Sequence, residues 1–170
     1  MKSIIYNNDN LHEEDISRIV RRAKAIIVND NHEILLACVN NNYHLPGGHV
    51  EENETYQECL IRELKEELGV DVKFEEKDPI ISIMYYSKDY PDKGVNTKTV
   101  ARYFEVREDI KPNLENTSLT EDEKNGGFEL KYIKEDEIIN FLTESLKTCT
   151  RENVVLDTIE AVKEYLNIKR

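Results

Sequence analysis

The chain has 170 residues, of which 39% are apolar and 34% charged, and its formal net charge is −12. This apolar content excludes disorder of the whole chain, and the length suits one domain with a single hydrophobic core. The excess of acidic residues would repel a polyphosphate backbone, so we expect no duplex nucleic acid as a partner.

The cysteines and the apolar runs predict the compartment. Cys38, Cys59 and Cys149 are widely spaced and form no CxxC pair, so they do not indicate a disulfide framework. The first residues lack the apolar core of a signal peptide, and no apolar run reaches the roughly 20 residues that span a bilayer. We therefore expect a cytoplasmic protein without a membrane partner, and a homodimer stays open.

The first predicted elements are two β-rich runs, residues 22–29 and 33–39, with three polar residues between them. This spacing favours a β-hairpin. A loop over residues 40–44 is expected next. It leads into Leu45-Pro46-Gly47-Gly48, where a proline and two glycines predict a sharp turn.

Residues 55–68 are predicted to form a helix. Thr55 and Glu58 match a capping box, and three leucines follow at four-residue spacing. Gly69 stands where a helix-terminating glycine is expected.

Four further strands are predicted from alternating or β-branched runs, at residues 70–74, 79–86, 97–106 and 128–133. Residues 111–127 are expected to form a long loop. Amphipathic patterns predict helices at 135–146 and 152–166 that cover the sheet. The fold class is therefore α+β in a single domain over residues 1–170, with a core at about 20–145 and a C-terminal helix at about 152–167 packed on it.

Three glutamates of the first predicted helix, Glu63, Glu66 and Glu67, are expected on one face, pointing away from the core. Like charges four residues apart destabilise an exposed helix by roughly a few tenths of a kcal/mol. A bound divalent cation would remove this repulsion. A solvated acidic face is the alternative, and it is the commoner meaning of such a cluster by itself.

The residues around these glutamates follow one pattern without a gap. From Gly48 to Val70 the sequence is GHVEENETYQECLIRELKEELGV, which matches G-x5-E-x7-R-E-U-x-E-E-x-G-U, where U is a bulky aliphatic residue. This segment resembles the signature box of the Nudix hydrolase family. The resemblance implies a mixed β-sheet sandwiched between helices. It also implies hydrolysis of a phosphoanhydride bond with Mg²⁺, or with Mn²⁺ as a substitute.

The resemblance further implies roles for residues of the box. The three helix glutamates would bind the metal, with one of them acting instead as the general base that activates water, and which one stays open. Arg62 would orient these glutamates, and Glu54 would belong to the same network. Gly48 would lie at the turn whose backbone carbonyl joins the metal sphere.

A further acidic metal ligand from outside the box is common in proteins that look like this one. We predict Glu129, which follows two glycines at the start of a predicted strand, with Glu121 and Glu123 as alternatives. A solvated loop acid is the other interpretation.

Candidate substrate-binding residues lie on the predicted strands. Arg22 and Arg102 are the basic residues expected nearest a phosphate, with surface salt bridges as the alternative. Tyr86 is predicted to stack on a nucleobase. Because neighbours on a strand point to opposite faces, only one of Tyr85 and Tyr86 would reach the pocket.

The leading hypothesis is metal-dependent hydrolysis of a small nucleoside diphosphate derivative, namely a nucleoside triphosphate, nucleotide sugar, ADP-ribose or dinucleoside polyphosphate. Two alternatives stay open. One is a hydrolase of non-nucleotide diphosphates, and the other is a ligand-sensing domain that keeps the fold without catalysis. The complete set of box glutamates speaks against the second.

Overall fold

A seven-stranded mixed sheet forms the centre of the computed structural model, which describes residues 1–72 and 78–169. The strand order is β1-β5-β6-β2-β3-β4, with β7 paired to β3. The strands are β1 (Lys2–Tyr6), β2 (Arg18–Val28), β3 (Glu33–Val39), β4 (Asn42–His44), β5 (Ile81–Ser87), β6 (Thr97–Arg107) and β7 (Glu129–Lys134). The helices are α1 (Tyr56–Leu68), α2 (Glu121–Asn125), α3 (Ile138–Ser145) and α4 (Glu152–Lys169), with 3₁₀ turns η1 (Glu13–Asp15) and η2 (Leu114–Asn116).

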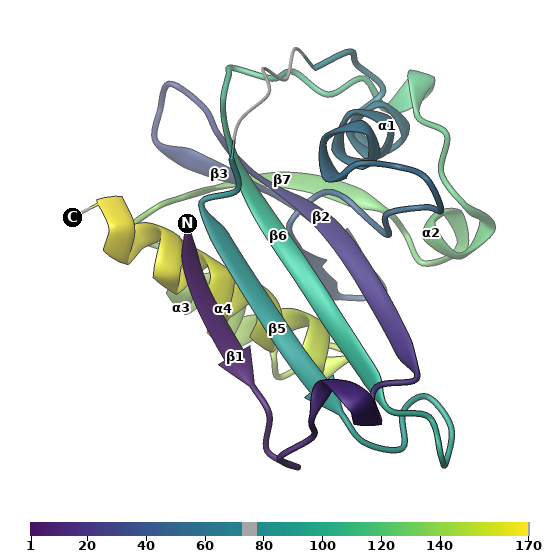
Figure 1. Cartoon of the computed structure of the whole chain (residues 1–170). Helices are drawn as coiled ribbons and strands as arrows, with labels where there is room; N and C mark the ends of the chain where they lie inside the picture. The colour runs from purple at the N-terminus through teal and green to yellow at the C-terminus, as the bar shows by residue number, and fades with distance from the viewer. Residues whose placement is uncertain (73–77, 170) are drawn as a thin grey trace.

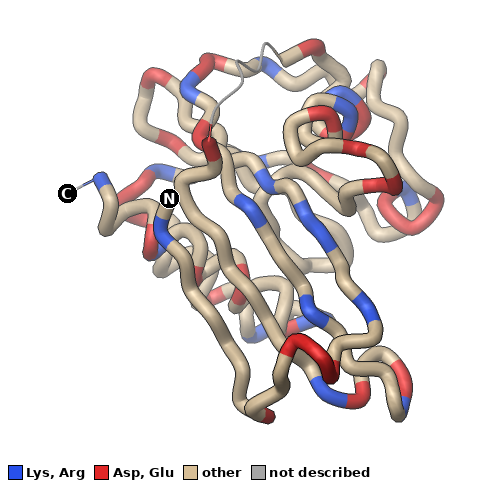
Figure 2. Tube along the Cα trace, in the orientation of Figure 1, with Lys and Arg blue, Asp and Glu red and all other residues tan. Residues whose placement is uncertain are grey.

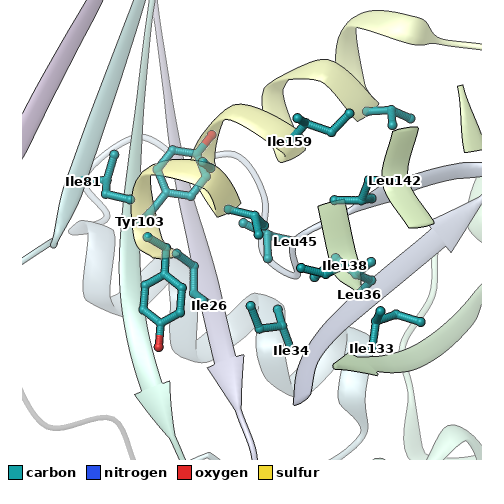
Figure 3. Close-up of a cluster of buried hydrophobic side chains, with 14 of the residues drawn as sticks. Ile26, Ile34, Leu36, Leu45, Ile81, Tyr103, Ile133, Ile138, Leu142 and Ile159 are labelled. Carbon is teal, nitrogen blue, oxygen red and sulfur yellow. The ribbon is translucent and has the colours of Figure 1, made fainter. Parts of the chain in front are cut away.

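Helices cover both faces of the sheet (Figure 1). Because alternate residues of a strand point to opposite faces, β2 contributes Ile26 to the layer under α3 and α4 and Ile27 to the layer under α1. Figure 3 shows the first layer, in which Ile138 and Leu142 of α3 and Ile159 of α4 meet isoleucines and leucines of the strands. The predicted class, a mixed β-sheet sandwiched between helices in one domain, is confirmed.

The predicted helix over residues 55–68 is present as α1. The Thr55 hydroxyl accepts a hydrogen bond from the Glu58 amide (3.2 Å), and the Glu58 carboxylate accepts one from the Thr55 amide (2.8 Å). Gly69 ends the helix in the left-handed conformation, with φ at +67°. The cap and the terminating glycine therefore set the ends of the helix that carries the box glutamates.

The predicted hairpin exists only at its tip. In the ladder between β2 and β3, only Val28 is paired with Ile34, whereas β2 runs parallel to β6 from Arg18 to Val28. The other edge of β2 binds the glycine-rich turn: the Ala23 amide donates to the Gly48 carbonyl at 3.0 Å. This pairing takes the place of the hairpin and holds the turn beside β2.

Several elements differ from the sequence prediction. The predicted loop over residues 40–44 contains β4, because Asn40 and Asn41 adopt positive φ and make a tight turn back from β3. The predicted loop over residues 111–127 contains η2 and α2, and a capping box of Thr120 and Glu123 starts α2. Residues 70–72 form no strand, and the rest of the strand predicted at 70–74 extends outside the described residues.

Strand β1 was not predicted, since only the three apolar residues Ile4, Ile5 and Tyr6 mark it in the sequence. It pairs in parallel with β5, so Lys2 lies beside Ile81. None of the helices in the described part of the chain combines the length and apolar composition that a membrane crossing needs.

Candidate active site

A cavity of about 460 Å³ opens on the sheet face that α4 covers. Its walls come from β2, β4, β5 and β6, from the turn at Gly47 and Gly48, from α1 and α2, and from the start of α4. Figure 2 shows Lys and Arg along β2 and β6, while Asp and Glu gather around α1 and α2. The cavity therefore combines acidic and basic walls in a strongly acidic chain.

Glu67 is buried at the inner end of the cavity, with 4% of its surface exposed. Its carboxylate accepts a 2.8 Å hydrogen bond from the Gly47 amide, and the Lys24 ammonium donates to the Gly47 carbonyl. Burial raises the pKa of Glu67 and lowers that of Lys24, while the attraction between the two charges opposes both shifts. The prediction that all three glutamates point away from the core is wrong for Glu67, because the glycine-rich turn folds over it.

Gly48 makes room for Glu63. A Cβ atom at Gly48 would overlap the Glu63 carboxylate, so a residue with a side chain there would displace it. Burial raises the pKa of Glu63, and the Arg62 guanidinium opposes this rise. The first glycine of the pattern therefore places a carboxylate against the backbone of the turn.

Arg62 joins the acidic residues into one network. Its Nε and Nη2 donate to the two oxygens of Glu54 (2.9 and 3.0 Å), and Nη1 donates to Glu63 (2.8 Å) and Glu66 (3.4 Å). Nη2 also donates to the His49 carbonyl at 3.1 Å. The hydrogen bonds from Arg62 hold the pKa of Glu54 below its usual value. This planar, bidentate contact fixes the side chain of Arg62 between α1 and the turn.

The predicted substrate residues divide between the two faces of the sheet. Arg22 and Tyr85 line the cavity, and the buried Arg22 Nε has no hydrogen-bond partner among residues 1–72 and 78–169. The structure places Arg102 and Tyr86 on the other face: Arg102 lies 4.4 Å from the ring centroid of Tyr56, and the Tyr86 hydroxyl donates to Glu13 at 2.5 Å. Strand alternation separates the pairs, because residues 85 and 86 must point in opposite directions.

The candidate ligand from outside the box also lies away from the cavity. Glu129 is exposed on β7 and accepts a 2.9 Å hydrogen bond from the Tyr43 hydroxyl. Its alternative Glu123, on α2, lines the cavity and adds to the negative potential at Glu67. The unpredicted helix α2 is what brings this carboxylate to the site.

The family model for the NUDIX domain matches residues 19–150. The chain belongs to the Nudix family of hydrolases.

Solved structures share this Nudix fold at low sequence identity. A Deinococcus radiodurans protein, DR0079, has a TM-score of 0.55 at 18% identity, covering 94% of this chain and 95% of its own. The MutT Nudix hydrolase of Burkholderia pseudomallei has a TM-score of 0.53 at 20% identity, covering 71% and 86%. The MutT protein of Methanosarcina mazei Go1 has a TM-score of 0.51 at 19% identity, covering 87% and 95%. No curated protein matches the chain.

The donor atoms of this Nudix site suit a hard divalent cation. The carboxylates of Glu63, Glu66 and Glu67 and the carbonyls of the turn offer only oxygen, which magnesium prefers. In this structure Arg62 and Lys24 supply the positive charge beside these oxygens. Across residues 1–72 and 78–169, no three His, Cys, Asp or Glu side chains are already gathered as a metal-binding group. The ligand chemistry fits, and binding would draw the carboxylates together.

The cavity lining also includes residues that were not singled out from the sequence, among them Lys24, His44, Arg151 and Asp157. Lys24 carried a usable signal, since it stands two residues from Arg22 and so shares its face of β2. The residues of α4 carried none, because the sequence does not say where that helix crosses the sheet.

The buried Asn42 side chain positions Arg151. Its Oδ1 accepts hydrogen bonds from the amides of Thr150 (3.0 Å) and Arg151 (2.7 Å), which ties the start of α4 to β4. Beside them, burial and the nearby charges of Lys24 and Arg151 lower the pKa of His44 to about 3. His44 is therefore neutral at physiological pH.

Proposed function

We propose that this Nudix hydrolase uses Mg²⁺ to cleave the pyrophosphate linkage of a nucleoside diphosphate joined to a further moiety. One observation carries the proposal. The carboxylates of Glu63 and Glu67, the glycine-rich turn, and the cations Arg22 and Lys24 face one cavity of about 460 Å³. Such a cavity offers carboxylates that can bind a metal and cationic side chains that can bind phosphate oxygens. Its size suits a small ligand.

The metal would be held by Glu63, Glu66, Glu67 and a carbonyl of the turn, with Glu123 as a further ligand in place of Glu129. A bound Mg²⁺ neutralises phosphate charge and lowers the pKa of a coordinated water. Mn²⁺ would serve as a substitute, since both ions accept oxygen ligands. Arg62 would keep Glu54 and Glu63 in position through its hydrogen bonds to both carboxylates.

In the proposed reaction, a water oxygen forms a bond to one phosphorus while the bond from that phosphorus to the bridging oxygen breaks. The proton of the water passes to a carboxylate, and the bridging oxygen leaves with the other phosphate. One of Glu63, Glu66 and Glu67 would act as this base instead of as a metal ligand, because all three belong to the same acidic network beside the turn. The products are a nucleotide and a phosphorylated remainder.

Arg22 and Lys24 would bind the phosphate oxygens that the metal does not. Both line the cavity from adjacent same-face positions of β2, and no hydrogen-bond partner of the Arg22 Nε lies in the described part of the chain. A guanidinium can form two parallel hydrogen bonds with a phosphate, which fixes its orientation. These contacts would place the diphosphate beside the glycine-rich turn.

The test is a product assay on the purified chain with Mg²⁺, over nucleoside triphosphates, nucleotide sugars, ADP-ribose, dinucleoside polyphosphates and isoprenoid diphosphates. We expect turnover of at least one nucleotide class, loss of turnover with a chelator, and loss in Glu67→Gln with ligand binding retained. Turnover of isoprenoid diphosphates alone would show a non-nucleotide hydrolase. No turnover of any compound by the wild-type chain would favour a ligand-sensing domain.

We also propose the cytoplasm as the compartment, because all three cysteines are unpaired thiols.

A further inference from the structure

The cavity extends across the sheet, away from the box glutamates. The glycine-rich turn lies along the edge of β2 that faces away from β6, where Arg22 and His49 form an isolated antiparallel β-bridge. From the turn, the strands follow across the sheet in the order β2, β6, β5. Neighbouring strands are about 4.8 Å apart, so three steps separate the turn from β5 by about 14 Å. A diphosphate bound at the turn therefore leaves the β5 end of the cavity to another part of the substrate.

The walls at this far end are mostly uncharged. Tyr85 of β5 and Ala101 and Tyr103 of β6 form the sheet side, and Thr158 of α4 also lines the cavity. The sheet and the helix thus enclose a slot with aromatic and apolar walls, which suits a planar ring.

Asp157 is the exception in this slot. Its carboxyl lines the cavity from α4, and the Tyr85 hydroxyl is hydrogen-bonded to it. No ion pair within 4.0 Å reaches it in the described part of the chain, although the Arg22 charge acts on it from farther away. Burial raises the pKa of this carboxyl, as expected for a group withdrawn from water. Nothing in the proposed hydrolysis uses Asp157.

The chemistry of a carboxylate limits what can bind beside it. A phosphate would be repelled, whereas an ionised carboxylate accepts hydrogen bonds at several lone pairs and donates none. The Tyr85 hydroxyl occupies one lone pair of the Asp157 carboxylate. The remaining lone pairs of the two carboxylate oxygens can accept hydrogen bonds from N–H groups on the edge of a ring. Guanine offers two such donors side by side, and adenine and cytosine offer an amino group next to an acceptor.

We infer that Asp157 is a specificity residue of this hydrolase, whose carboxylate accepts hydrogen bonds from the N–H donors of a nucleobase and so selects guanine nucleotides. The inference rests on the proposed function for the identity of the substrate. It concerns a different part of the cavity from the glutamates, so binding can be measured apart from hydrolysis.

The experiment compares Asp157→Asn with a matched control, Glu160→Gln. Glu160 lies on the same helix and also accepts a tyrosine hydroxyl, from Tyr6 at 2.7 Å, but it does not line the cavity. Affinities for GMP, IMP, AMP and ribose 5-phosphate are measured by calorimetry without metal. The kcat/KM ratio for GTP and ITP is measured with Mg²⁺.

In the wild type and in Glu160→Gln we expect GMP to bind more tightly than IMP, which lacks one donor, and than AMP. In Asp157→Asn we expect the affinity for GMP to fall about 10- to 100-fold and the preference over IMP to disappear, as for a hydrogen bond to a charged group. The GTP to ITP ratio should fall in parallel.

An unchanged order of bases in Asp157→Asn would overturn the inference. An equal loss for every ligand, with a lowered unfolding midpoint, would show a structural role and would also overturn it. Tight binding of ribose 5-phosphate that depends on Asp157 would assign the slot to a sugar. If instead base selection follows Asp157 but no pyrophosphate is hydrolysed, the proposed function fails while the assignment of the slot stands.

Discussion

The amide of Gly47 donates a 2.8 Å hydrogen bond to the carboxylate of Glu67, 20 residues along the chain. This contact joins the glycine-rich turn to α1 and buries one acid of the box, while Glu66 keeps 40% of its side chain exposed. The three glutamates are therefore not equivalent, although the sequence pattern treats them alike.

Gly47→Ala should destabilise the protein by at least about 2 kcal/mol, because the backbone has φ at +116° and a Cβ would overlap the Ala23 carbonyl. Urea unfolding measures the change. Gly127→Ala is the matched control, since Gly127 also has positive φ (+66°) but no atom of the described residues lies within 4 Å of its Cβ position, and the substitution should cost only about 1 kcal/mol. Equal losses in the two variants would contradict the close approach at Gly47.

Arg62→Lys should lower kcat/KM about 10- to 100-fold while the protein remains folded, because an ammonium cannot donate to Glu54 and Glu63 in the planar arrangement that Arg62 uses. Steady-state kinetics and a circular dichroism spectrum test this. Arg107→Lys is the control, since Arg107 pairs with Glu105 at the surface and the variant should keep full activity. Full activity in Arg62→Lys would show that the network is dispensable.

Glu123→Gln should weaken Mn²⁺ binding about tenfold, as expected when a carboxylate that supports the three box glutamates is lost. Glu129→Gln should leave the Mn²⁺ affinity unchanged. The reason is placement, because Glu123 lines the cavity, whereas Glu129 lies on β7 and accepts a hydrogen bond from the Tyr43 hydroxyl. Electron paramagnetic resonance of free Mn²⁺ measures both affinities. The opposite order would restore Glu129 as the ligand from outside the box.

His44 should make the protein sensitive to acid. Its pKa is about 3 in the folded chain, below the ordinary value of 6.5, so the unfolded state binds more protons between these values. The contribution of His44 to the free energy of unfolding is therefore fully present above pH 6.5. It falls by about 1.4 kcal/mol per pH unit as the pH drops towards 3. Urea unfolding at pH 7 and at pH 4.5 tests this. Between these two pH values, the free energy of unfolding of His44→Gln should fall by about 2 to 3 kcal/mol less than that of the wild type. Parallel losses in the two proteins would refute the assignment.

Local patterns account for the parts of the structure that were predicted. Thr55 and Glu58 start α1 and Gly69 ends it through contacts within a few residues, so their spacing alone carried the information. The same spacing placed Arg62 among the box glutamates. Residues brought together over short sequence distances are the ones that a pattern describes.

Contacts between distant segments account for the rest. The burial of Glu67 depends on how the turn folds over α1, and the pairing of β1 with β5 joins residues near the N-terminus to residues beyond position 80. Asp157 enters the cavity only because α4 crosses the sheet opposite Tyr85. These contacts join segments that are far apart in the sequence, so the local periodicity of apolar and polar residues does not predict them.

The central claim is that the box glutamates bind a divalent cation at the glycine-rich turn. A crystal of the protein grown with Mn²⁺ and measured at a wavelength where manganese scatters anomalously tests it most directly. We predict an anomalous peak between the carboxylates of Glu63, Glu66 and Glu67, with ligand distances of about 2.1 to 2.2 Å. Ordered carboxylates that keep their contacts with Arg62 and Gly47, with no anomalous peak beside them at saturating Mn²⁺, would contradict the account.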